Sequence, residues 1–128
     1  MSVARRVSAF LQLAEEELAA ARLLETAGPR QAAYFCQQSA EKLARAILAK
    51  AGVPFGTGHG LARMAESLPE SHPWRPKLES LDKHSPAATR YRYPTQTGRL
   101  FDPPDVDRLR ADIAELERLL DDARGELG

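Results

Sequence analysis

Apolar residues recur every three or four positions along most of this chain, and that spacing places them on one face of an α-helix. The first run of this kind covers residues 3–25. It ends at Gly28-Pro29, a pair that can close one helix and open the next. A second run covers residues 33–51 and stops at Gly52-Val53-Pro54. We therefore predict two long amphipathic helices that pair as an antiparallel hairpin.

The rest of the chain predicts shorter helices and one further long one. A short helix is expected over residues 61–68, and a fourth helix over residues 78–88. Apolar positions from Val106 to Leu127 then alternate at spacings of three and four, with Asp102 as the expected N-cap. No segment alternates with the period of a strand. We therefore predict an all-α fold, a bundle of four main helices plus one short helix, in a single domain over residues 1–128.

Charge is unevenly distributed, although the formal net charge is zero. Residues 28–99 carry eleven basic and five acidic side chains, whereas residues 100–128 carry four basic and nine acidic ones. A neutral chain exerts no overall attraction on nucleic acid or membranes. The basic middle of the chain could still bind an anion, or it could pair with the acidic last helix.

Composition argues against several kinds of site. The one cysteine, Cys36, cannot form an internal disulfide, and its place on an apolar stripe predicts a buried, unreactive thiol. No run approaches the roughly 18 apolar residues that a membrane span needs. The three histidines lack zinc-ligand spacing, so we expect neither metal nor cofactor, with His72 and His84 at the surface. These features predict a cytoplasmic protein without membrane contact.

The segment Arg90-Tyr91-Arg92-Tyr93-Pro94 carries the most distinctive chemistry of the chain and holds two of its three tyrosines. A guanidinium group can bind phosphate or carboxylate through two parallel hydrogen bonds, and a tyrosine ring can stack on a base. Alternatively, the segment is a helix end whose rings pack on the core while its arginines face water. The sequence leaves both interpretations open.

A second group of polar residues shares one side of the second predicted helix. Its members are Tyr34, Gln38, Glu41, Lys42 and Arg45. The two cations could hold a phosphate while Glu41 orients a cation or accepts a hydrogen bond from a ribose hydroxyl. A solvated helix face would explain the same pattern without any ligand.

His59 lies just before the third predicted helix, in the glycine-rich stretch Gly56-x-Gly58-x-Gly60. The first backbone N–H groups of a helix have no internal partners, so this position favours an anion. His59 could equally cap the helix and have no chemical role. The glycines follow a helix and a proline turn rather than a strand, so they are not a dinucleotide-binding fingerprint.

Several of these pieces, taken in order, resemble the HEPN (higher eukaryotes and prokaryotes nucleotide-binding) domain family. They are Gln37-Gln38-Ser39-Ala40-Glu41-Lys42 and the helix after it, Gly52, His59-Gly60-Leu61 and Arg92-Tyr93-Pro94. The resemblance implies an up-and-down bundle of four to five helices that usually dimerises. It also implies one of two roles. Some members are metal-independent ribonucleases, and others are nucleotide- or RNA-binding modules beside a minimal nucleotidyltransferase, often as a toxin–antitoxin pair.

The chain departs from the ribonuclease pattern of an arginine, four to six residues and a histidine. No arginine stands at that distance before His59, His72 or His84, and Lys77 before His84 is the nearest approach. Thr95 and Gly60 also stand where the family commonly has aspartate. These departures leave no assignable catalytic residue.

We therefore expect a non-catalytic module that binds a nucleotide or RNA as a homodimer, beside a minimal nucleotidyltransferase. The expected contacts are Gln38, Glu41, Lys42, Arg45, His59, Arg92 and Tyr93. A partner or antitoxin subunit that binds no nucleotide ranks second, and a ribonuclease ranks third.

Overall fold

The computed structural model of this chain describes residues 2–56 and 60–127, and within them it is built from helices alone. The long helices are α1 (Val3–Leu24), α2 (Pro29–Ala51) and α5 (Val106–Leu127). The short ones are α3 (Leu61–Glu66), α4 (Arg75–Ser80) and the 3₁₀-helix η1 (Leu81–Ala88). The predicted all-α bundle is confirmed. None of the described helices is long and apolar enough to cross a membrane.

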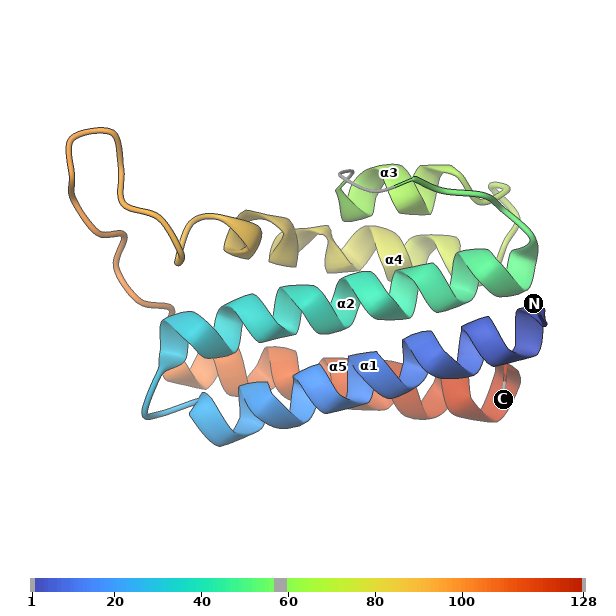
Figure 1. Cartoon of the computed structure of the whole chain (residues 1–128), viewed down its shortest axis with the longest axis horizontal. Helices are drawn as coiled ribbons and strands as arrows, with labels where there is room; N and C mark the ends of the chain where they lie inside the picture. Colours follow the sequence, from blue (N-terminus) through green and yellow to red (C-terminus); the bar gives the residue numbers. More distant parts are fainter. Residues whose placement is uncertain (1, 57–59, 128) are drawn as a thin grey trace.

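Helices α1 and α2 form the predicted antiparallel hairpin, with α5 packed against both (Figure 1). Small buried side chains such as Ala14, Ala40 and Ala44 let the two backbones approach closely. The hydroxyl of Ser39, which is fully buried, donates a hydrogen bond to the backbone oxygen of Ala14 at 2.8 Å. The hairpin is therefore joined by a specific polar contact as well as by its apolar face.

The acidic last helix forms ion pairs with α1 and η1, and one of its partners, Lys83, comes from the basic middle of the chain. Arg22 of α1 pairs with Glu117, and Arg124 of α5 pairs with Glu15. Lys83 of η1 lies 3.3 Å from Asp112 and 3.1 Å from Glu115. Part of the basic charge of the chain is thus neutralised by α5.

Helices α3, α4 and η1 lie on the side of α2 away from α1 (Figure 1). The predicted fourth helix is divided here, because α4 gives way to a 3₁₀-helix at Leu81. Pro86 lies inside η1 and has no N–H to donate, which is incompatible with a regular α-helix at that point. Asp82 of η1 accepts a hydrogen bond from the backbone N–H of Ala62 at 3.1 Å, so η1 also caps the start of α3.

The predicted start of the last helix is wrong by several residues. Helix α5 begins at Val106, and its cap is Asp105, whose carboxylate accepts the backbone N–H of Arg108 at 3.0 Å. Asp102 lies outside the helix. Two consecutive prolines, Pro103 and Pro104, follow it, and the second disfavours helical geometry at the first. The expected capping chemistry is present, but it is supplied three positions later.

Residues 89–105 connect η1 to α5 and project from one end of the bundle, while both termini lie at the other end (Figure 1). The tip is a closed turn. Thr95 accepts the backbone N–H of Gly98 and donates its own to Arg99, and Gly98 has a φ of 82°, which suits glycine. Arg30 of α2 bonds the backbone oxygen of Phe101 at 2.9 Å and anchors the return of this connection.

Candidate functional site

Arg92 lies on aromatic rings at the start of the polar side of α2. Its guanidinium carbon is 4.6 Å from the ring centre of Tyr34 and 5.5 Å from that of Tyr93. No carboxylate among the described residues pairs with it. A guanidinium stacked on rings keeps its N–H groups free for an incoming acceptor. The structure therefore brings together the aromatic and cationic parts of two motifs that are about 60 residues apart.

The rings beside Arg92 differ in exposure. Tyr93 is 58% exposed, whereas Tyr91 is half-buried against the core. The interpretation as a packed helix end therefore fits Tyr91, and the interpretation as a stacking surface fits Tyr93. Tyr91 belongs to a packed end of the helical region, and Tyr93 remains available for stacking.

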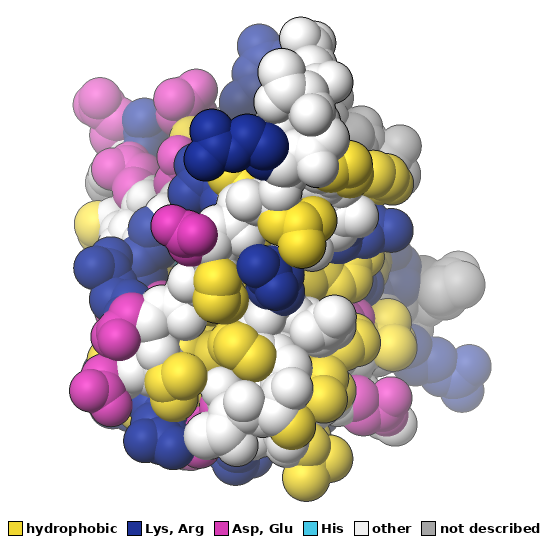
Figure 2. Space-filling model, turned by 90° about the vertical axis from the view of Figure 1, so that its left-hand side faces the viewer, with side chains coloured by type: hydrophobic (Ala, Val, Ile, Leu, Met, Phe, Trp, Pro, Cys, Tyr) yellow, Lys and Arg dark blue, Asp and Glu magenta, His cyan; other side chains and the backbone are white. Residues whose placement is uncertain are grey.

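A shallow hollow adjoins this cluster, formed by η1 and the connection that follows it. Its volume is about 290 Å³, and Arg90, Tyr93 and Phe101 line it. Arg90 lies over the ring of Phe101 at 5.5 Å. Figure 2 views this end of the molecule and shows hydrophobic side chains gathered across its centre, with basic side chains between them. The end of the bundle therefore combines exposed rings with positive charge.

Lys42 is engaged within the fold. Its ammonium lies 2.9 Å from a carboxylate oxygen of Glu17 on α1 and donates to the side-chain oxygen of Gln38 at 3.2 Å. Only 19% of the Lys42 side chain and 18% of the Glu17 side chain are exposed. Gln38 also donates to Gln37, which is buried. These polar residues join α1 to α2, and the alternative of a solvated helix face does not describe them.

Arg45 and Glu41 form a second internal pair farther along α2. Their side chains are 3.6 Å apart, and Arg45 also donates to the backbone oxygen of Gly56 at 3.3 Å. Arg45 thus holds the segment that follows α2 against the helix. Six of the seven residues predicted as one site are described, and they separate into two groups. Arg92 and Tyr93 form an uncommitted cluster, whereas Gln38, Glu41, Lys42 and Arg45 are bonded within the fold.

The structure describes two of the three histidines, and one of these two, His84, is placed differently from the prediction. His59 lies outside the described residues, so its expected role at the start of α3 is not described. His72 is half-buried, and its ring nitrogen accepts the backbone N–H of Trp74 at 3.1 Å. His84 was expected at the surface, and this is wrong, because only 6% of it is exposed. It occupies the buried side of η1 together with Leu81 and Ala87, at the three-residue period of a 3₁₀-helix.

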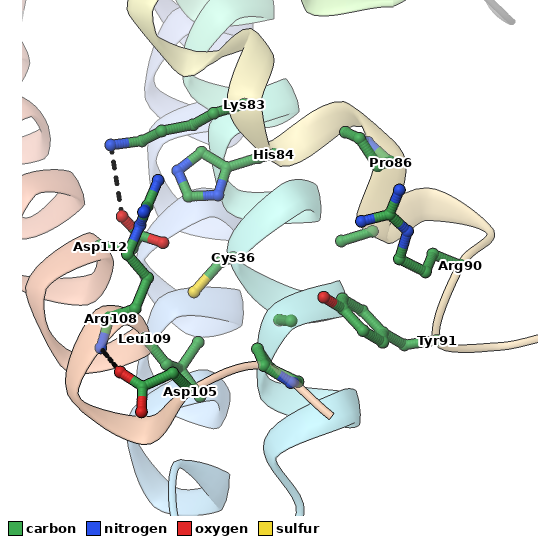
Figure 3. A pocket seen from close by; sticks show the side chains of 13 residues that line it. Cys36, Lys83, His84, Pro86, Arg90, Tyr91, Asp105, Arg108, Leu109 and Asp112 are labelled. Carbon is green, nitrogen blue, oxygen red and sulfur yellow. Dashed lines mark hydrogen bonds and ion pairs between the residues drawn. The ribbon is translucent and has the colours of Figure 1, made fainter. Parts of the chain in front are cut away.

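His84 borders a cavity of about 310 Å³ that the sequence did not reveal (Figure 3). Cys36 lines the same cavity, and burial raises the pKa of its thiol to about 12, with the charge of Asp112 acting in the same direction. The thiol is therefore protonated at neutral pH, as expected for an unreactive cysteine. Burial lowers the pKa of His84 below its ordinary 6.5.

Metal binding finds no support in the described ranges, because they hold no group of three or more histidine, cysteine, aspartate or glutamate side chains placed to share an ion. Lys77, the nearest match to the ribonuclease arginine, lies over the ring of Trp74 at 4.4 Å. The contacts described for Lys77 and Arg92 are with aromatic rings.

The comparison with family models gives a match over nearly the whole chain. The model of the HEPN domain matches residues 7–125, from α1 to the end of α5. The comparisons with curated proteins and with solved structures found no match. The family match agrees with the resemblance carried by the helix α2 motif and by Arg92-Tyr93-Pro94. The chain belongs to the HEPN domain family.

Proposed function

We propose that this protein is a nucleotide- or RNA-binding module whose contact surface is the end of the bundle around Arg92. The observation that carries the proposal is the position of Arg92 on Tyr34 and Tyr93, without a carboxylate partner among the described residues. Its guanidinium would bind a phosphate, and the exposed ring of Tyr93 would stack on a base. Membership of the HEPN family supports this choice of ligand.

Lys42 and Arg45 take a supporting role in this proposal. Each already has an acidic partner and a further oxygen acceptor within the fold. Releasing them to a phosphate would leave a half-buried carboxylate without its cation, which is unfavourable. We therefore assign them, with Gln38 and Glu41, to holding α2 in position behind the contact surface.

A short fluorescent single-stranded RNA and labelled ATP would test the proposal by anisotropy, in EDTA and at two salt concentrations. We expect saturable binding of at least one probe, which weakens as salt rises because each phosphate contact releases counterions. Intact RNA after incubation would agree with a binding module. The absence of binding by both probes at low salt would contradict the proposal.

The partnership is also a proposal. We propose that the protein forms a homodimer and acts in the cytoplasm beside a minimal nucleotidyltransferase, in the manner of a toxin–antitoxin pair. Exposed apolar side chains at the same end support a protein contact, since Leu23 is 83% and Leu100 is 70% exposed. Light scattering tests the dimer, and co-purification with a nucleotidyltransferase encoded next to this chain tests the partner.

The same exposed side chains favour a second candidate, a partner subunit that binds no nucleotide. The two candidates differ in what Leu100→Ser and Arg92→Gln would do. A nucleotide-binding module would bind RNA and would lose affinity for it with Arg92→Gln. A pure partner subunit would bind no RNA, and would lose its protein complex with Leu100→Ser.

A further inference from the structure

The connection from η1 to α5 projects from the bundle as an arm with two limbs (Figure 1), and both limbs are held against α2. On the outgoing limb, the guanidinium of Arg92 lies 4.6 Å from the ring centre of Tyr34. On the returning limb, the backbone oxygen of Phe101 accepts hydrogen bonds from Arg30 at 2.9 and 3.3 Å. Arg90 lies over the ring of Phe101 at 5.5 Å and joins the two limbs. The arm therefore presents its side chains on a fixed framework.

Two shallow hollows adjoin each other along the arm and share Phe101 as a lining residue. The first has a volume of about 290 Å³ and is also lined by Arg90 and Tyr93. The second has a volume of about 330 Å³ and is also lined by Arg99. The rings of Tyr93 and Phe101 are both exposed. A guanidinium group and an exposed ring thus occur together twice in succession.

The arginines of this surface have no acidic partner among the described residues. They are Arg30 of α2 and Arg90, Arg92 and Arg99 of the arm. The arm also holds two aspartates, of which Asp105 caps α5 and Asp102 lines the second hollow. Guanidinium groups therefore outnumber carboxylates here, and the surface suits a ligand with more than one negative charge.

A free nucleotide would use only part of this surface. Its one base could stack in one hollow, and the ring and arginine of the other hollow would remain in contact with water. A duplex does not suit the exposed rings, because its bases are already stacked inside the helix. A single strand supplies one base and one phosphate per nucleotide, which is the repeat that the two hollows provide.

We propose that the arm binds single-stranded RNA across at least two consecutive nucleotides. One base stacks on Tyr93 and the next on Phe101, while successive phosphates lie at Arg92 and Arg99. This inference rests on the proposed function and deepens it, since it makes the ligand a strand that follows the arm rather than a free nucleotide.

A length series tests the inference. Fluorescent oligouridylates of one, two and four nucleotides are titrated into the native protein at one low salt concentration, and binding is followed by anisotropy. We expect the affinity to rise at least tenfold from the mononucleotide to the tetranucleotide. A mononucleotide that binds as tightly as the tetranucleotide would overturn the inference and leave the proposed function in place. Absence of binding at every length would contradict both.

Variants of the arm locate the second contact. Arg99→Gln should weaken binding of the tetranucleotide at least fivefold and leave the mononucleotide unchanged, because the mononucleotide binds at Arg92. Phe101→Leu keeps the backbone oxygen that Arg30 binds and should have the same selective effect. Arg118→Gln, at an exposed position of α5, is the matched control and should change neither affinity.

Two results with these variants would overturn the inference. One is a tetranucleotide affinity that neither Arg99→Gln nor Phe101→Leu changes. The other is an equal loss for the mononucleotide and the tetranucleotide, which would show that both ligands use a single contact. Loss of a protein complex in both variants, with RNA affinity unchanged, would assign the arm to a protein partner instead.

Discussion

At the scale of single residues, equal charges have unequal surroundings in this protein. Arg92 and Lys42 both lie in segments that resemble the HEPN family, but Arg92 rests on two rings while Lys42 is bonded to Glu17 and Gln38. The sequence identified both as candidates because charge and spacing are visible in it. It could not show which cation was already neutralised, since Glu17 belongs to another helix, 25 positions away. Partnering across helices is a tertiary property.

His84 is the residue whose environment the sequence analysis missed. The three-residue spacing of Leu81, His84 and Ala87 places it on the buried side of η1, although a lone histidine gives no apolar signal in the sequence. Pro86 was the available signal for that tighter geometry.

Burial of His84 should make stability depend on pH. Its pKa in the folded protein is below the 6.5 of the unfolded chain, so the unfolded state takes up the proton first as pH falls. The free energy of unfolding should therefore decrease as pH falls below about 6.5, until the pKa of the folded state is passed. Urea unfolding at about pH 7.5 and about pH 5.5 measures this change, which should be smaller in His84→Gln. An imidazole resonance of His84 that titrates at or above 6.5 would contradict this account.

At the scale of elements, the three long helices were predicted well, and the connections less well. Amphipathic periodicity extends over many turns in α1, α2 and α5, so single exceptions do not hide it. The segment from Arg75 to Asp105 is rich in proline and divided into short pieces of α-helix, 3₁₀-helix and turn. Local signals there compete, and tertiary contacts such as Asp82 with the start of α3 decide the outcome.

The end of α2 offers a direct test of local backbone geometry. Gly52 has a φ of 73°, and Val53 donates its N–H to the oxygen of Leu48 at 2.9 Å, as in a Schellman cap. Gly52→Ala should lower the free energy of unfolding by about 1 kcal/mol, because an L side chain strains this conformation. Gly125→Ala is the matched control. It lies in α5 with open space around it and should raise stability by about 0.5 kcal/mol. Equal effects in urea unfolding would refute this reasoning.

The link between α1 and α2 should depend on Lys42. Lys42→Met keeps the length of the side chain but removes the cation from Glu17, and should lower the free energy of unfolding by about 1–3 kcal/mol. Lys50→Met, at an exposed position of the same helix, should change it by no more than about 0.5 kcal/mol. Both are measured by chemical denaturation. Unchanged stability together with lost RNA binding would show instead that Lys42 contacts the ligand.

At the scale of the whole molecule, the helices pair charged side chains with one another, while one end of the bundle is left open to partners. Helix α5 pairs with α1 and η1, whereas the segment of residues 89–105 carries the exposed Arg92 and Tyr93. Figure 2 shows hydrophobic and basic side chains together at this end. Fold class and family could be predicted from the sequence, because both rest on patterns that run along the chain. The cavity beside His84 could not, because it depends on how three elements pack together.

The central claim is that the Arg92 end of the bundle contacts nucleotide phosphate. The most direct measurement compares the dissociation constants of Arg92→Gln and Arg118→Gln for one short single-stranded RNA, alongside the native protein. Both variants remove one positive charge. The second does so at an exposed position of α5, about 18 Å along the helix from its start. We predict at least a tenfold loss of affinity, about 1.4 kcal/mol, for Arg92→Gln and little change for Arg118→Gln. Equal losses in the two variants, or no loss in either, would contradict the claim.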